Sequence, residues 1–341
     1  MSRLVIIGNG FDIAHGLKTS YKDLMEFILC QKNPLDFRSN NVGKCGLLHH
    51  TFKNEENPYI GFLYENGKYK FSTCRDNPSF YFLRLFEDFN LYNNWADLES
   101  LYFKLISEHL TVKSRINLIN KEFDLLKEIL EDYLYNQIES KLEGFSPLIN
   151  NAIETFNLDT DSLIGIINFN YTKKIINYYT SNLHRFGNKQ LLNNFKLINI
   201  HGELQSKENP IIFGYGDDNS SDYKVIQGAH NDELLKNFKT FQYLRNSNYI
   251  QALALLETET NIKVEIIGHS CGLADKTLLK TIFEHPNVSR IEYRYHSDES
   301  HYFTNLYNIS RIFTDNELMR KKVIDLKNTR IFGVNKLVLS K

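Results

Sequence analysis

Short runs of apolar, β-branched residues alternate along most of the chain with longer stretches in which apolar residues recur every three or four positions. Runs of the first kind are typical of buried parallel strands, and the longer stretches are typical of helices packed on a sheet. We predict strands at residues 3–7, 161–169, 195–200, 211–213, 263–267 and 289–295. Helical stretches follow most of these strands, which predicts an α/β fold with a parallel sheet.

One long segment, residues 31–157, interrupts this alternation. Its first part has no sustained period and predicts loops, with a short hairpin near residues 59–72. Its second part, from residue 79 to about residue 156, has helical spacing. We therefore predict a Rossmann-like nucleotide-binding domain formed by residues 1–30 and 158–341, and a large, mainly helical insertion at 31–157.

One helix of the insertion begins with the sequence WADLE at residues 95–99. Its two acids suit the positive end of the helix dipole, which is the simpler interpretation. The alternative is that they project into a site.

The first predicted strand ends in Gly8-Asn9-Gly10, followed by Phe11 and Asp12. A buried strand that ends in Gly-x-Gly presents backbone N–H groups to a phosphate in many α/β proteins. The third glycine of the dinucleotide fingerprint is replaced by Ile13, and no acidic residue ends a second strand at the expected distance. The alternative is a plain turn between a strand and a loop.

Polar or small residues also follow the other predicted strands. The carboxyl ends of parallel strands lie along one edge of a sheet, where ligands bind. We therefore expect one common site from residues that are distant in sequence: Asn9, Asp12, Asn170, His201, Asp217 and Ser270.

The composition is that of an ordinary soluble globular protein, with 42% hydrophobic and 24% charged residues in 341. A net charge of −1 does not indicate a protein built to hold nucleic acid. Neither a signal peptide nor an apolar run long enough to span a membrane is apparent. We therefore expect a cytoplasmic protein without a membrane partner.

The four cysteines have no paired spacing, so we expect free thiols. A zinc cluster of Cys45, His49, His50 and Cys74 would match no standard ligand spacing. We predict no metal.

Residues 268–272 read Gly-His-Ser-Cys-Gly between a predicted strand and a helix, which fits the nucleophile elbow of serine hydrolases. Asp298 with His301 or His296 would have to complete a triad around Ser270. The hydrolase fold takes its Asp and His from separate later strand ends, whereas here one strand and its helix hold every candidate. A serine hydrolase remains an alternative function.

Six segments together identify a family. The segments GNGFDIAHGLKTSY, WADLE, INFNYT, IHGEL, IIFGYGD and IIGHSCGLAD resemble the AbiH family of bacterial abortive-infection proteins, in that family's order and over nearly the whole chain. The resemblance implies a role in defence against phage, with a phage-derived trigger and self-association as expected partners.

The family is in turn remotely similar to sirtuin-type NAD-binding proteins, several of which hydrolyse NAD in phage defence. This resemblance implies a sirtuin-like fold with NAD as substrate or ligand, and catalytic roles for His201, Asn170 and Asp12. The cofactor-binding residues it implies are Gly8, Asn9, Gly10, Phe11, Asp12, Gly268, His269 and Ser270. The chain departs from the sirtuin pattern at Thr172, which replaces an aspartate, at Asn9, which replaces an alanine, and at Phe11-Asp12, which replace small and hydroxyl residues.

The implied reaction is cleavage of the nicotinamide–ribose bond through an oxocarbenium-like transition state. His201 would act as general base on a ribose hydroxyl or on water, Asn170 would orient ribose or water, and Asp12 would bind a ribose hydroxyl or stabilise positive charge. Taken without the resemblance, His201 reads as a buried histidine bonded to a carbonyl, and Asn170 as a helix N-cap. A nucleotide sensor or assembly protein without catalysis is the non-enzymatic alternative.

Overall fold

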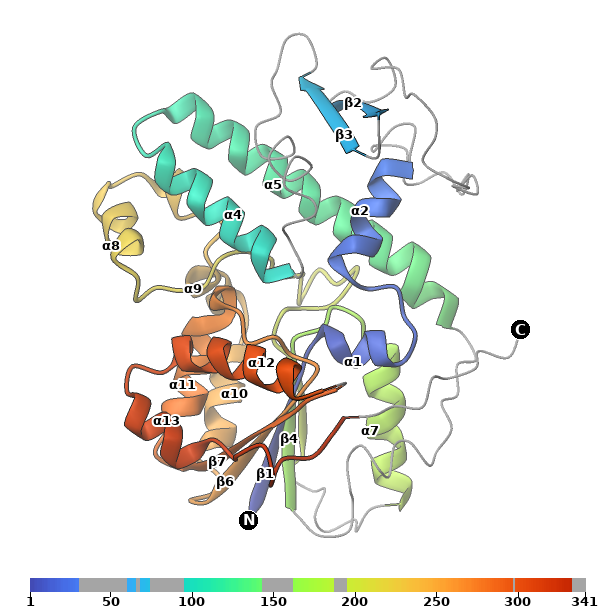
Figure 1. Ribbon diagram of the computed structural model, residues 1–341, viewed down its shortest axis with the longest axis vertical. Coiled ribbons are helices and arrows are strands. Elements are labelled where there is room, and N and C mark those ends of the chain that lie inside the picture. The colour runs from blue at the N-terminus through green and yellow to red at the C-terminus, as the bar shows by residue number, and fades with distance from the viewer. Residues whose placement is uncertain are drawn as a thin grey trace.

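A computed structural model describes residues 1–30, 60–65, 68–73, 95–142, 162–186, 195–296 and 298–332. Its centre is a five-stranded, all-parallel sheet with the order β5-β4-β1-β6-β7 (Figure 1). The strands are β1 (Ser2–Ile7), β4 (Ser162–Asn168), β5 (Lys196–Asn199), β6 (Ile262–Ile267) and β7 (Val288–Arg294). This confirms the α/β, Rossmann-like fold class.

Side chains of β1 alternate between the two faces of the sheet and are buried on both. Val5 and Ile7 belong to one hydrophobic cluster, whereas Leu4 and Ile6 belong to another. The first cluster contains α1 (Asn9–Ala14), α2 (Tyr21–Cys30), α4 (Trp95–Glu108), α5 (Lys113–Tyr133) and α7 (Lys174–Phe186). The second contains α10 (Asn248–Leu256), α11 (Lys276–Glu284) and α12 (Glu299–Ile312). Helices thus cover both faces, which explains why the strand sequences are continuously apolar.

The insertion contributes helices that lie beyond the carboxyl ends of the strands. Figure 1 shows α4 and α5 there, beside α2. After α5 the chain continues through a π-helical segment (Leu134–Ile138) and a 3-10 turn (Glu139–Leu142). The predicted helical character is thereby confirmed for residues 95–108 and 113–142, with a turn between them. The predicted hairpin is confirmed as β2 (Ile60–Glu65) paired antiparallel with β3 (Lys68–Thr73).

The remaining segments are short. They are η3 (Asp232–Leu234), η4 (Tyr243–Arg245), η5 (Leu273–Asp275), α8 (Ser221–Gly228), α9 (Lys239–Gln242) and α13 (Asn316–Lys322). Among the described residues, no helix is both long and apolar enough to cross a membrane.

Two local predictions were wrong. Residues 211–213 do not form a strand: their burial accounts for the apolar run, but Ile212 makes a single backbone bond, from its N–H to the carbonyl of His201, and joins no ladder. The alternative of a plain turn between the first strand and a loop is also wrong, because the glycine turn leads directly into α1. The proposed cysteine and histidine cluster at residues 45–74 lies outside the described residues.

Sheet register aligns the strand ends. Ile7 of β1 pairs with Asn168 of β4 and Ile267 of β6, and Asn168 pairs with Asn199 of β5. Since all strands run the same way, the residues immediately after each strand emerge side by side beneath the insertion helices.

Candidate functional site

A cavity of about 240 Å³ lies at this edge of the sheet. Each strand end of the sheet's centre contributes to its wall: Gly8, Asn9, Gly10 and Asp12 after β1, Asn170 and Thr172 after β4, His201 after β5, and Gly268, His269 and Ser270 after β6. The insertion contributes Trp95, Ala96 and Glu99 from α4, and Leu134. The predicted convergence of distant strand ends is thus observed.

Two predicted residues do not line the cavity. The ring of Phe11 is buried against His15, Tyr179 and Phe332. Asp217 is also buried, and its carboxylate accepts a hydrogen bond from Lys276 Nζ at 3.2 Å.

The glycine turn holds the loop after β6. The N–H of Gly8 donates to the carbonyl of Ile267 at 3.0 Å, and the N–H of Gly10 donates to the carbonyl of Gly268 at 2.7 Å. These amides are therefore not available to a phosphate, contrary to the role expected from the motif. Within the described turn 8–10, only the Asn9 amide lacks such a partner.

The glycines are needed because the two loops approach each other closely. A Cβ on Gly10 would lie 2.8 Å from the Cα of Gly268, and a Cβ on Gly8 would lie 2.6 Å from the Cα of His269. Gly268 itself has φ +67°, a backbone region that favours glycine.

We expect Gly10→Ala to destabilise the protein by about 1–3 kcal/mol, because its methyl group meets backbone atoms that cannot swing away. Gly228→Ala is the matched control, since a Cβ there has open space. Chemical denaturation of both variants measures the difference. Equal midpoints would contradict the close packing of the two loops.

Asp12 is a buried carboxyl group in the cavity wall. It accepts a hydrogen bond from Thr172 Oγ1 and another from Asn170. Asp12 and Thr172, which follow two different strands of the sheet, are therefore direct partners. Burial raises the pKa of Asp12 to about 7, against the lowering effect of its bond from Thr172.

We expect Asp12→Asn to raise thermal stability at pH 8. The folded-state pKa lies above the usual value of 3.8, so ionisation of Asp12 destabilises the folded protein progressively as pH rises from about 4 to about 7. The variant should therefore melt about 3 °C or more above wild type at pH 8, with the gap closing toward pH 4. Thermal scans across pH check this, and a gap independent of pH would contradict it.

A second buried group, Asp275, organises the histidines of the site. Its Oδ1 accepts from His201 Nε2 at 3.1 Å, and its Oδ2 faces His269 Nε2 at 3.4 Å. His269 Nδ1 accepts the N–H of Cys271 at 3.0 Å, so its proton lies on Nε2. Burial would raise the pKa of Asp275, but Lys239 and His201 outweigh it and hold that pKa well below its usual range.

His201 is a neutral, oriented imidazole. Burial, assisted by the positive charge of Lys239, lowers its pKa to about 4. With Nε2–H directed at Asp275, the lone pair lies on Nδ1. This is the protonation state that a general base requires. The partners of Nε2 are the Asp275 carboxylate and, at 3.2 Å, the Tyr243 hydroxyl, and not the backbone carbonyl of the simpler interpretation.

Lys239 and Glu99 complete this buried cluster. Lys239 Nζ lies 2.6 Å from Asp275 Oδ1 and 2.9 Å from Glu99 Oε1. Burial would lower the pKa of Lys239, but the two carboxylates outweigh it and raise that pKa. Burial also raises the pKa of Glu99 to about 7, against the opposing effect of Lys239. Of the two acids in WADLE, Glu99 therefore reaches the site.

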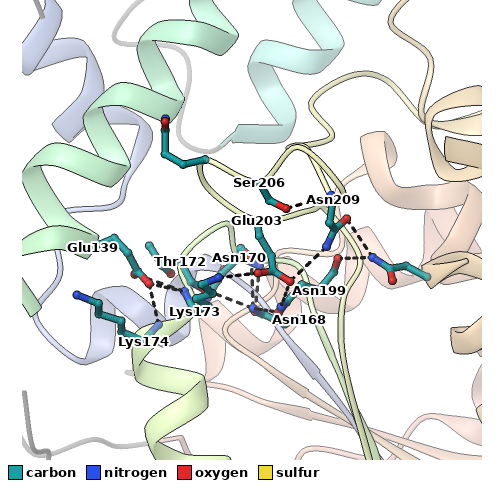
Figure 2. Close-up of polar contacts among 12 residues, drawn as sticks. Glu139, Asn168, Asn170, Thr172, Lys173, Lys174, Asn199, Glu203, Ser206 and Asn209 are labelled. Carbon is teal, nitrogen blue, oxygen red and sulfur yellow. Dashed lines mark hydrogen bonds and ion pairs between the residues drawn. The ribbon is translucent and has the colours of Figure 1, made fainter. Parts of the chain in front are cut away.

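The segment after β4 is fixed by polar contacts (Figure 2). Asn168 Oδ1 accepts the N–H of Asn170 at 3.1 Å, and Asn168 Nδ2 donates to Asn199 Oδ1 at 3.0 Å. The carboxylate of Glu139 accepts the N–H groups of Lys173 and Lys174 at the start of α7. Asn170 is therefore not the cap of α7, and its side chain is left to Asp12 and the cavity.

The elbow alternative lacks its geometry. The strained φ of +52° belongs to Cys271 and not to Ser270. No described residue hydrogen-bonds the Ser270 hydroxyl, and His269 is occupied by Asp275 and Cys271. Asp298 is the N-cap of α12, where it accepts the N–H of His301. These contacts do not form a Ser-His-Asp triad.

Comparisons with known proteins identify the family. The model of the family described as bacteriophage abortive infection AbiH matches residues 4–296. This range includes every residue named above for the cavity wall; His301 and Asn305 of α12 lie beyond it. The comparison with curated proteins gives no match. Since the family model spans most of the chain, this protein belongs to the AbiH family of bacteriophage abortive-infection proteins.

Proposed function

We propose that the protein acts in abortive infection by hydrolysing NAD at the nicotinamide–ribose bond. The observation that carries the proposal is the gathering of Asp12, Asn170 and His201, from three separate parts of the chain, in one cavity at a strand-end edge. A neutral imidazole, an amide and a buried carboxylate are the groups this cleavage calls for.

In the proposed reaction the bond between ribose C1′ and the pyridinium nitrogen breaks, and its electron pair leaves with nicotinamide, which becomes neutral. The ionised form of Asp12 stabilises the positive charge that develops on the ribose. Asn170 orients the ribose or the attacking water. Water bonds to C1′ and gives a proton to His201, so the products are nicotinamide, ADP-ribose and one proton.

The cavity fits one end of the dinucleotide. Its volume of about 240 Å³ is below the range of about 300–1,000 Å³ that is usual for drug-sized ligands. The described wall contains no Lys or Arg side chain. The nicotinamide riboside would therefore occupy the cavity, and the diphosphate would lie toward the partly exposed His296 and His301, near the Asn9 amide.

Phage infection of cells that carry the protein tests this function. We expect NAD to fall and phage yield to drop with wild type, and neither change with His201→Ala present at equal abundance. Protection of wild-type cells without any fall in NAD would contradict the proposal.

The same experiment distinguishes NAD hydrolysis from the alternative of a nucleotide sensor without catalysis. Protection that persists in His201→Ala cells, with NAD unchanged in both strains, would make the cavity a nucleotide sensor. A phage product as trigger and self-association of the chain remain predictions.

A further inference from the structure

One side of the cavity is aromatic. Trp95, at the start of α4, contacts Tyr21 at a ring-centroid distance of 6.3 Å, and its Nε1 donates to the backbone carbonyl of Thr19 at 3.1 Å. Trp95, Tyr21 and Thr19 all line the cavity. We call the two rings, Trp95 and Tyr21, the aromatic wall. The hydrogen bond and the ring contact hold the indole in place, so the wall is preorganised for a flat ligand group.

Thr19 supports this wall through its backbone carbonyl, which accepts the indole N–H. Its residue is 2% exposed, and its hydroxyl has no hydrogen-bond partner in the described structure. That oxygen is closed to a water-sized atom, so the rings of the wall, and not this hydroxyl, face a ligand in the cavity.

The electrostatics beside the wall favour positive charge. Glu99 follows Trp95 by one helical turn, which brings both side chains to the same face of α4. Asp12 and Asp275 also line the cavity. Among the described residues, Lys239 is the cation that contacts Glu99 and Asp275, and no contact joins it to Asp12. Aromatic faces near carboxylates attract a cation more than a neutral ring.

We infer that the aromatic wall receives a planar, positively charged N-heteroaromatic ring, the oxidised pyridinium end of a nicotinamide nucleotide, and not adenine. The inference rests on the proposed function, which puts the nicotinamide riboside in the cavity, and adds which residues receive its ring and why a charged ring is preferred. It also gives the α4 insertion a role in ligand selection.

Trp95 provides the readout, because it is the only tryptophan among the 341 residues. A pyridinium ring stacked near an indole quenches its fluorescence. We would titrate His201→Ala, which blocks turnover, with nicotinamide mononucleotide and with AMP. The two probes share a ribose 5-phosphate and differ only in the ring.

We expect nicotinamide mononucleotide to quench Trp95 and to bind about tenfold more tightly than AMP.

Calorimetry with NAD separates the two claims. NAD binding without quenching, or quenching by AMP at least equal to that by nicotinamide mononucleotide, overturns the ring assignment and leaves the proposed function standing. An absence of NAD binding defeats the proposed function and this inference with it.

Discussion

His201→Ala is expected to lower nicotinamide release from NAD about 10²–10⁴-fold, the usual contribution of a general base. The imidazole is neutral at physiological pH because burial lowers its pKa to about 4, and Asp275 fixes its tautomer. Since the substitution removes one of the residues that line the cavity and keeps the others, NAD binding should persist. Release is measured by chromatography and binding by calorimetry.

A second substitution separates loss of the base from loss of structure. His201→Gln keeps an N–H that can donate to Asp275 but cannot accept a proton near neutral pH. It should be as inactive as His201→Ala with a melting temperature closer to wild type. His285→Gln is the control, because that ring pairs with Glu257 and does not line the cavity. Substantial activity in His201→Gln would show that the imidazole only orients its neighbours.

Lys239→Met is expected to cost about 3–5 kcal/mol of stability, the largest effect we expect outside the reaction itself. The side chain is 1% exposed, and its removal leaves Glu99 and Asp275 as buried carboxylates without their shared cation. Part of the cost should be recovered as pH falls and Glu99 takes up a proton, because its pKa is about 7 with Lys239 present and rises further once that cation is removed. Denaturant unfolding at several pH values measures both effects.

Lys236→Met is the matched control for this prediction. Lys236 makes an ion pair of similar length, 2.8 Å, with Asp124, but both side chains are close to half exposed. Its loss should cost at most about 1 kcal/mol, because water screens the pair and solvates the partner left behind. Similar costs for Lys236→Met and Lys239→Met would contradict a buried charge cluster under the site.

The positions of most strands and the residues that follow them could be predicted because both depend on local sequence. Continuous apolar runs identify buried parallel strands, and all the residues that follow them meet at one edge, as Asn170, His201 and Ser270 do. The interpretation of the 211–213 run failed because burial alone makes a segment apolar, whether or not it pairs in a sheet.

The buried cluster of Lys239, Glu99 and Asp275 could not be predicted in the same way. Lys239 lies 140 positions from Glu99 and 36 from Asp275 in sequence, and no local pattern relates them. One signal was present: Glu99 falls one turn after Trp95 and one before Tyr102 and Phe103, on the apolar face of α4. An acid on such a face needs a buried partner.

The role of the glycine turn could not be predicted from the sequence either. Gly-x-Gly after a strand fits both a phosphate cradle and a close crossing of loops. Only the hydrogen bonds from Gly8 and Gly10 to residues 267–268 distinguish the two, because they use the amides that a phosphate would need.

The most direct test of the central claim uses protein purified from phage-infected cells that it protects, so that any trigger has acted. This protein and its His201→Ala counterpart are incubated with NAD, and nicotinamide and ADP-ribose are quantified. We predict equal amounts of the two products from wild type and neither from the variant, which still binds NAD. Protein from protected cells that leaves NAD intact would contradict the account.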